Sequence, residues 1–266
     1  MLYTVCYVNI RLQLTADGDK MNIGLIGYGR MGRLTAEVAK NRGHTVIKHF
    51  NSKEPLISAG QIKNIECLID FSVPDAVPSA IIAAVDAKVN VVVGTTGWDR
   101  NILNDFHNTL ESALFIAANF SIGVNIFRLI LMQATKLLDS AGGYDVALRE
   151  IHHKTKLVSP SGTALKISED IISLSSNKKK IMTGSPTGKI PDDTLQITSE
   201  RIGDVIGVHE ISFESEVDSI LFRHQMKDRS AFAVGALDMA EWLKGRSGIL
   251  GFKDYLADEF GIGNID

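Results

Sequence analysis

Two histidines and two lysines lie within five residues near the middle of the chain, in the segment Glu150–Lys156. A histidine titrates near neutral pH and a lysine carries a positive charge, so this segment can both supply a proton and attract an anion. The segment Ser161–Thr163 precedes an expected helix, where hydroxyl and backbone N–H groups bind carboxylates well. Together the two segments predict a site for a small substrate with two negative charges, beside an acid that donates a proton.

Three other interpretations of these residues stay open. A metal site is disfavoured, because no companion carboxylate or cysteine has the spacing of a ligand, and we expect no bound metal. An exposed basic loop, or a serine or threonine that caps a helix without binding a ligand, is compatible with the same residues. The concentration of titratable groups favours a functional site over a plain surface loop.

A glycine-rich motif in the first part of the chain has the pattern GxGxxG. It follows an expected buried strand and opens an expected helix, which is the context in which this motif binds the pyrophosphate of a dinucleotide. The first glycine permits a tight turn, the second lets the backbone approach the phosphates, and the third allows close packing of helix and strand. A simple glycine-rich turn is the weaker alternative. The residues are Gly27, Tyr28, Gly29, Arg30, Met31 and Gly32.

The residue that would contact the adenosine ribose is expected roughly 20 positions further on, at the end of the second strand. This position is near Asn51 and is not acidic. An asparagine can form a hydrogen bond with a hydroxyl, and Lys53 or Arg30 could meet a 2′-phosphate. An exposed loop without a cofactor contact is an equal alternative, so the preference between NADH and NADPH stays open.

Alternating strands and helices before Asn119 predict a parallel sheet covered on both faces. The strands are expected at 22–26, 45–50, 66–71, 89–93 and 114–118, with a helix over 31–42. After Asn119 we expect a helix over 124–138, a strand over 145–151, a helix over 164–174 and a polar loop over 175–191. Two consecutive strands at 209–214 and 219–226 then indicate a mixed or antiparallel sheet, before a helix over 231–243. The predicted fold is α/β, a Rossmann-like doubly wound parallel sheet with a second α+β domain built on a mixed sheet.

The composition is that of an ordinary globular protein: of 266 residues, 45% are hydrophobic and 22% charged, and the formal net charge is −3. This charge argues against nucleic-acid binding, and no apolar run approaches the roughly 20 residues of a membrane span. Cys6 and Cys67 form no CxxC motif or disulfide framework, which suits a reducing cytoplasm. Residues 1–20 lack the pattern of a signal peptide, and Met21 directly precedes the first strand, so we expect 1–20 to be an extension outside the fold.

Several ordered motifs resemble the dihydrodipicolinate reductase family, which transfers hydride in diaminopimelate and lysine biosynthesis. The resemblance runs from Met21 nearly to the C-terminus, and its most specific part is the signature Glu150–Ala164. The other motifs are Gly27–Gly32, Asp70–Ser72, Gly94–Gly97, Ala118–Ser121 and the spaced set Arg201, Gly203, Gly207 and His209. The resemblance implies a dinucleotide-binding domain over 21–120, to which 235–266 return, and a substrate-binding and oligomerisation domain over 121–234. It also implies a homotetramer built through the second sheets.

The same resemblance implies roles for individual residues. His152 matches the catalytic histidine and Lys156 the proton-donating lysine, and the sequence does not rank the two as donors. The substrate carboxylates would be bound by His153, Ser161, Gly162 and Thr163. The pyrophosphate would lie against 27–31, and the nicotinamide would be lined by Gly94, Thr95, Thr96, Ala117, Ala118, Asn119 and Phe120.

Three sites, one of two residues and two of one residue, depart from the family pattern. Val158-Ser159 stand where the family usually has Asp-Ala, which puts contacts behind the loop in doubt but not the catalytic pair. Asn51 replaces the acid that would contact the ribose. Val208 stands where a glutamate often precedes the histidine.

The predicted function is the reduction of 4-hydroxy-tetrahydrodipicolinate or dihydrodipicolinate to tetrahydrodipicolinate, with hydride from NADPH or NADH. Another Rossmann-type dehydrogenase of the aspartate pathway is the nearest alternative. An aspartate-semialdehyde dehydrogenase needs a cysteine nucleophile in its catalytic domain, and both cysteines lie too early. A homoserine dehydrogenase would leave the histidine–lysine segment unexplained. A regulator that senses a dinucleotide without turnover would need a partner surface or a nucleic-acid module, and the sequence shows neither.

Overall fold

The computed structural model describes residues 20–106 and 110–261, which form two compact units. The first unit contains the described residues up to Ile116 together with Leu237–Leu250, and the second contains Ala117–Ala236 together with the described residues from Gly251 on. The predicted domains, 21–120 with 235–266 and 121–234, differ from these units. Of the predicted return, Leu237–Leu250 belong to the first unit, whereas the described residues from Gly251 on belong to the second, as do Ala117–Phe120. As functional domains they stay a prediction. The predicted extension, 1–20, lies outside the described residues except for Lys20.

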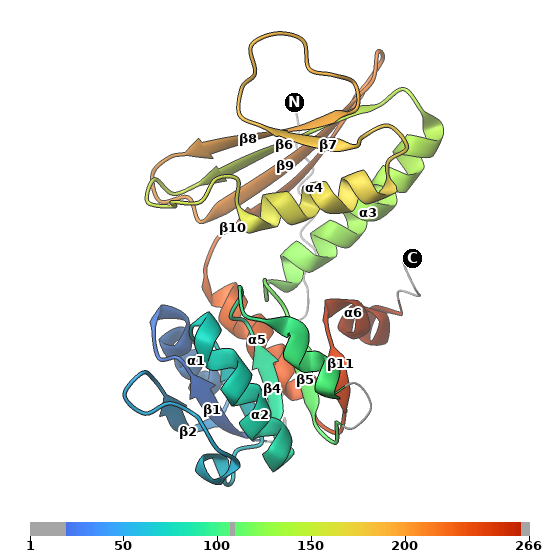
Figure 1. Ribbon diagram of the computed structural model, residues 1–266. Helices are drawn as coiled ribbons and strands as arrows, with labels where there is room; N and C mark the ends of the chain where they lie inside the picture. The colour runs from blue at the N-terminus through green and yellow to red at the C-terminus, as the bar shows by residue number, and fades with distance from the viewer. Residues whose placement is uncertain (1–19, 107–109, 262–266) are drawn as a thin grey trace. The chain divides into compact units, whose positions relative to one another are not determined.

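A six-stranded parallel sheet forms the centre of the first unit, in the order β11-β5-β4-β3-β1-β2 (Figure 1). The inner strands are short and almost wholly buried, as expected for a parallel sheet with both faces covered. The strand bounds are β1 Asn22–Ile26, β2 Thr45–Phe50, β3 Cys67–Asp70, β4 Asn90–Val93, β5 Ala113–Ile116 and β11 Gly248–Leu250.

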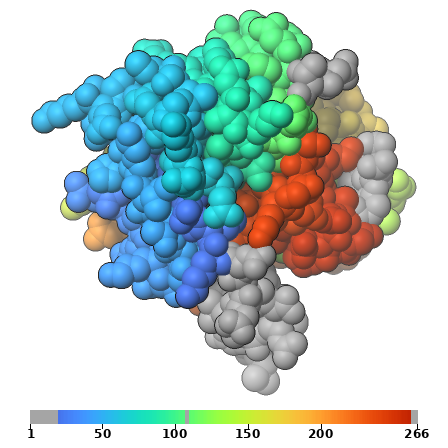
Figure 2. All heavy atoms as spheres, turned by 90° about the horizontal axis from the view of Figure 1, so that it is seen from below, coloured from blue at the N-terminus to red at the C-terminus, as the bar shows by residue number. Residues whose placement is uncertain are grey.

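The helices of this unit are α1 (Arg30–Asn41), α2 (Val77–Ala87) and the second half of α5 (Ser230–Trp242). Short 3-10 turns lie at Ala59–Ile62, Pro74–Ala76 and Arg100–Phe106. The C-terminal return is held by β11, which pairs with β5, and by the ring of Trp242, which lies edge-on to Phe115 at 6.0 Å. Figure 2 shows the surface of this unit, where orange-red residues of the return adjoin blue and green residues from before Ile116.

The second unit is built on a five-stranded mixed sheet in the order β10-β9-β6-β8-β7. β9 runs antiparallel to β6 and β10, whereas β6, β8 and β7 run parallel. Figure 1 shows α3 (Ile122–Ala141) and α4 (Gly162–Leu174) on one side of this sheet, and their apolar faces share a core with it. The other elements are β6 Asp145–His152, β7 Lys180–Thr183, β8 Thr194–Arg201, β9 Gly207–Glu214, β10 Ser219–Met226 and α6 Phe252–Phe260.

The predicted fold class is confirmed, since a parallel sheet with helices is followed by a second, mixed sheet. The predicted loop 175–191 was wrong in part, because it contains β7. The segment Lys180–Thr183 is short, begins with a lysine and lies at the sheet edge, so it carries little strand pattern. Among residues 20–106 and 110–261, no helix has the length and apolar character of a membrane span.

Candidate active site

The C-terminal end of β6 carries the centre of the candidate site. Alternate side chains of a strand point to opposite faces of the sheet. The face of β6 that directs Val146 and Leu148 into the core therefore also directs Glu150 and His152 inward. This row begins apolar and ends polar, so two titratable side chains are buried at the strand end.

Glu150 is completely buried, at 0% exposure, and its carboxylate is held by three donors. The backbone N–H of Ser161 donates to Oε1 at 3.0 Å and to Oε2 at 3.1 Å. The Ser199 hydroxyl and the Arg201 guanidinium donate to Oε1 at 2.8 and 3.2 Å. Burial alone would raise the pKa of Glu150, but the hydrogen bonds from Ser161 and Ser199 outweigh it and lower that pKa. Glu150 is therefore a buried anion.

Two imidazoles lie beside this carboxylate. His152 Nδ1 is 3.4 Å from Glu150 Oε2, and His209 Nε2 in β9 is 3.9 Å from the same oxygen. The two rings meet edge-on, with centroids 5.4 Å apart. Burial lowers the pKa of each histidine to about 4. At neutral pH both rings are therefore uncharged in the free protein.

The loop after β6 presents the remaining predicted substrate contacts. Thr163 Oγ1 accepts a 3.4 Å hydrogen bond from Asn119 Nδ2, and Gly162 is exposed at the start of α4. Ser161 caps α4, since its hydroxyl oxygen accepts from the Ala164 N–H at 3.1 Å. The first turn of α4 contains no acidic residue, so its N-terminus can attract an anion.

The cationic and titratable groups of this loop are partly accessible. His153 Nδ1 lies 2.7 Å from the Thr155 hydroxyl, and the Lys156 side chain is half-buried. Lys156 Nζ forms no ion pair or hydrogen bond with any residue that the structure describes. Its charge is therefore available to a substrate anion.

Glu150, His152 and His209 have the residue types of a metal site, and their ligand atoms lie within 4.8 Å of one another. The sequence argument against a companion carboxylate overlooked Glu150, which is two residues before His152 on the same strand face. The Arg201 guanidinium already donates to this carboxylate, and both Arg201 and Lys156 lower the pKa of His152 by their charge. The same charges repel a divalent cation, so the arrangement favours proton chemistry.

The first half of the glycine-rich motif, Gly27–Gly29, lines a pocket of about 830 Å³ in the first unit, whereas Met31 and Gly32 do not line it. Gly27 has a φ of +85°, and a Cβ there would lie 2.4 Å from the Phe71 carbonyl oxygen. A Cβ on Gly32 would lie 2.1 Å from the Gly27 oxygen, whereas Gly29 has open space beside it. No side chain caps the start of α1, which leaves its first N–H groups for a phosphate. The residues present fit a dinucleotide.

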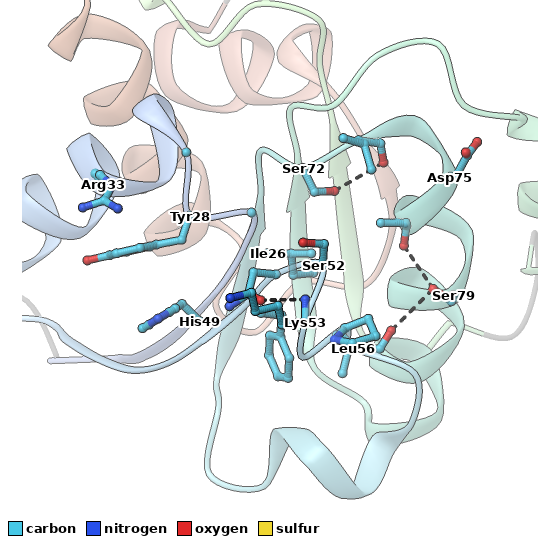
Figure 3. A pocket seen from close by; sticks show the side chains of 17 residues that line it. Ile26, Tyr28, Arg33, His49, Ser52, Lys53, Leu56, Ser72, Asp75 and Ser79 are labelled. Atoms are coloured by element: carbon cyan, nitrogen blue, oxygen red, sulfur yellow. Dashed lines mark hydrogen bonds between the residues drawn. The ribbon is translucent and has the colours of Figure 1, made fainter.

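The walls of this pocket carry cations and an aromatic stack. Figure 3 shows Tyr28 between Arg33 and His49. The Tyr28 ring stacks on the His49 ring with centroids 4.2 Å apart, and the Arg33 guanidinium carbon lies 5.1 Å from the Tyr28 ring centroid. Asn51 and Lys53 also line the pocket. The Asn51 side-chain oxygen accepts from the N–H groups of Lys53 and Glu54 at 2.9 and 3.3 Å, and so closes the turn after β2. The exposed Arg30, unlike Arg33, is not among the lining residues.

The remaining predicted cofactor residues are divided between the two units. Gly94–Thr96 follow β4 in the first unit, where the buried Thr95 hydroxyl donates to Asp70 at 2.7 Å. Ser72 donates to the same Asp70 oxygen, so this carboxylate joins the ends of β3 and β4. Ala117–Phe120 belong to the second unit, where Phe120 is buried and Asn119 contacts Thr163.

Sequence reasoning missed Glu150 and His49. For the cationic role it named Lys53 or Arg30, and the pocket lining contains Lys53 and, in addition, Arg33. His209 was noted only as part of a motif, although it lies in the buried group. The alternation of β6 could have identified Glu150, because a charged residue on a buried strand face needs partners. The contact between His209 and His152 joins residues far apart in the chain, so no local pattern indicates it.

Comparison with known proteins gives similarity over nearly the whole described chain. Family models described as the N-terminus and the C-terminus of dihydrodipicolinate reductase match residues 21–120 and 123–256. The 4-hydroxy-tetrahydrodipicolinate reductase of Christiangramia forsetii is 37% identical over 246 residues, which cover 90% of this chain and 99% of that protein. The enzyme of the same name from Neisseria meningitidis serogroup B is 30% identical over 254 residues, covering 86% and 94%.

A solved structure shares the fold. The dipicolinate-bound dihydrodipicolinate reductase from Paenisporosarcina sp. TG-14 superimposes with a TM-score of 0.70 at 22% identity. The alignment covers 87% of this chain and 97% of that chain.

Proposed function

The chain belongs to the dihydrodipicolinate reductase family, and from this premise we propose that it reduces 4-hydroxy-tetrahydrodipicolinate, or the dihydrodipicolinate formed from it by loss of water, to tetrahydrodipicolinate. The relatives are named for this activity, and their similarity to this chain covers nearly their full length. Within this chain, the observation that carries the proposal is the half-buried Lys156 ammonium, which has no partner among the described residues and whose charge acts on His152, together with the start of α4, whose first turn contains no acidic residue. A dicarboxylate substrate would supply the anions that these groups lack.

The substrate contacts follow from what each group can offer. Gly162 and Thr163 present backbone N–H groups and a hydroxyl at the start of α4, where a carboxylate is favoured by the helix dipole. His153 and Lys156 add donors from the loop, and Lys156 adds a full charge. Ser161 contributes its backbone N–H to Glu150, so its substrate contact is limited to the hydroxyl. We assign the two carboxylates to this set.

Reduction requires a hydride and a proton, and NADPH or NADH supplies the hydride when bound. The proton comes from this chain, and we assign it to Lys156. His152 is uncharged at neutral pH because burial lowers its pKa to about 4, so it holds no spare proton there. An ammonium beside the developing negative charge both stabilises that charge and neutralises it by proton transfer.

The cofactor pocket supports use of NADPH at least as well as NADH. Lys53 and Arg33 line the pocket, and Asn51 supplies no charge that would repel a 2′-phosphate. Asp75 is the acidic residue of the lining, and it lies in the 3-10 turn Pro74–Ala76 before α2 rather than after β2. We further propose a homotetramer in the cytoplasm, supported by family membership and by exposed apolar residues such as Leu221 in the second sheet.

The test is a coupled assay in which the product of dihydrodipicolinate synthase is offered with NADPH and with NADH. Oxidation of either nucleotide that depends on both the substrate and the protein is the expected result. Binding of the nucleotide without oxidation would favour a regulator instead. Turnover of aspartate semialdehyde or homoserine, but not of this substrate, would favour another dehydrogenase.

A further inference from the structure

Glu150 is buried at the centre of the site, yet the proposed proton transfer does not use it. Its Oε1 atom accepts from Ser199 and Arg201 and shares the Ser161 N–H with Oε2. Among the described residues, Oε2 receives that single N–H and otherwise faces two imidazoles. Burial of a carboxylate costs free energy unless it has partners, so the groups that contact Glu150 indicate its role.

The charge on Oε2 selects which nitrogen of each ring carries hydrogen. A neutral imidazole has one N–H and one lone pair. A lone pair directed at a carboxylate is repelled and an N–H is attracted, and the facing atoms are His152 Nδ1 at 3.4 Å and His209 Nε2 at 3.9 Å. The 3.4 Å approach does not have the angle of a full hydrogen bond. It still favours Nδ1–H in His152 and Nε2–H in His209.

The His209 tautomer decides what the Ser161 hydroxyl can do. His209 Nε2 lies 3.3 Å from Ser161 Oγ, and the same oxygen accepts from the Ala164 N–H at 3.1 Å. If His209 donates, both lone pairs of the hydroxyl oxygen are engaged, and its proton is left to donate. A carboxylate at the start of α4 is the acceptor that such a hydroxyl would take.

We propose that Glu150 is a positioning residue, which fixes the tautomers of His152 and His209 and, through His209, makes Ser161 a donor to a substrate carboxylate. The identity of that substrate rests on the proposed function, but the tautomers do not. His152 then presents Nε2 as an acceptor, which leaves proton donation to Lys156. The charged and titratable groups that face the two rings are Glu150 in β6, Arg201 in β8, His224 in β10, and His153 and Lys156 in the loop.

The first test reads the tautomers without substrate. Long-range ¹H–¹⁵N spectra of the ¹⁵N-labelled full chain at neutral pH should show Nδ1–H for His152 and Nε2–H for His209, each assigned by its variant. Glu150→Gln keeps the shape of the side chain but replaces its charge with a neutral amide, and it should change the tautomer of His152, of His209 or of both. Glu200→Gln, which removes the exposed carboxylate that pairs with Arg149 on the same sheet, should convert neither. Opposite tautomers in the wild type, or no change in Glu150→Gln, would overturn the proposal.

The second test measures dipicolinate binding by calorimetry, and it stands if Glu150→Gln fails to fold. His209→Leu removes the donor to Ser161, whereas His209→Gln keeps an N–H donor of similar reach. We expect Kd to rise about tenfold in His209→Leu and to return to within about threefold of the wild type in His209→Gln. Equal binding by the Leu variant and the wild type would overturn the role of Ser161. If the wild type does not bind dipicolinate, the proposed function is contradicted, and the tautomers still decide the role of Glu150.

Discussion

Arg42 and Asp238 lie 196 residues apart in the chain, and their side chains meet at 2.6 Å. Arg42 follows the last turn of α1, and Asp238 lies in the half of α5 that belongs to the first unit. The two side chains are 14% and 15% exposed, so the ion pair is largely removed from water. The His44–Glu241 contact at 2.7 Å lies beside it. These pairs fix the C-terminal return against α1.

Arg42→Met should destabilise the protein, because it keeps an unbranched aliphatic stem but leaves Asp238 buried without its cation. Burial already raises the pKa of Asp238, and the charge of Arg42 opposes that effect. We expect the free energy of unfolding in urea to fall by about 3 kcal/mol, the lower end for a broken buried pair. Lys88→Met breaks the exposed pair with Glu111 and should cost less than about 1 kcal/mol. Equal losses in the two variants would show that the Arg42 pair contributes no more than a surface contact.

Asn51→Asp should shift the cofactor preference toward NADH. An aspartate can accept the same N–H groups of Lys53 and Glu54, so the turn after β2 is kept while a negative charge is added. That charge would repel a 2′-phosphate and accept from a ribose hydroxyl. We expect the ratio of kcat/KM for NADPH over NADH to fall about tenfold or more, equivalent to ~1.4 kcal/mol.

Matched lysine variants test the same wall of the pocket. Lys53→Gln should weaken NADPH and leave NADH nearly unchanged, whereas Lys63→Gln, on an exposed residue outside the pocket lining, should affect neither. A strong preference of the wild type for NADH would show that other residues recognise the ribose.

Stability should fall as the pH is lowered from about 6.5 to about 4. In this window the unfolded chain protonates His152 and His209, while the folded protein holds both neutral because burial lowers each pKa to about 4. The unfolded state therefore binds more protons, and stability rises with pH by at most about 1.4 kcal/mol per pH unit for each histidine. His209→Gln should flatten the dependence of Tm on pH in this window. A slope that His209→Gln does not change would mean that His209 is protonated in the folded protein.

Local patterns predicted much of the first unit, since the spans of β1 and β2 were predicted without error and Gly27–Gly32 was placed at a strand–helix junction. Each of these depends on residues close in sequence. β8 was not predicted, although its buried Leu195 and Ile197 alternate with the more exposed Gln196 and Thr198, as in a strand with one face in the core. Its parallel pairing with β6 is a tertiary contact, and that pairing brings Ser199 and Arg201 to Glu150.

The site was predicted as a set of residues but not as an electrostatic arrangement. The sequence indicated His152 and Lys156 and left their roles open. Burial of His152 depends on β9, which contributes His209 and Gly207 against its ring. Only the folded sheet therefore shows that His152 is neutral at pH 7, and this distinguishes the two candidates for the proton donor.

Lys156→Ala should lower kcat by about a hundredfold or more at saturating substrate, since a group that acts mainly in the transition state is lost. Thr163→Ala should mainly raise KM, because in the proposed site Thr163 would hold a carboxylate in both the ground state and the transition state. NADPH binding, measured separately by fluorescence titration, should be unchanged in both variants.

The dependence of kcat on pH distinguishes Lys156 from His152 as the proton donor. If His152 donates, kcat should fall as the pH rises through the pKa that His152 has in the complex, and a kcat without such a fall would exclude His152 as the donor. Near-normal turnover in both Lys156→Ala and His152→Ala, with cofactor still bound, would show that the segment Glu150–Lys156 binds substrate without donating the proton.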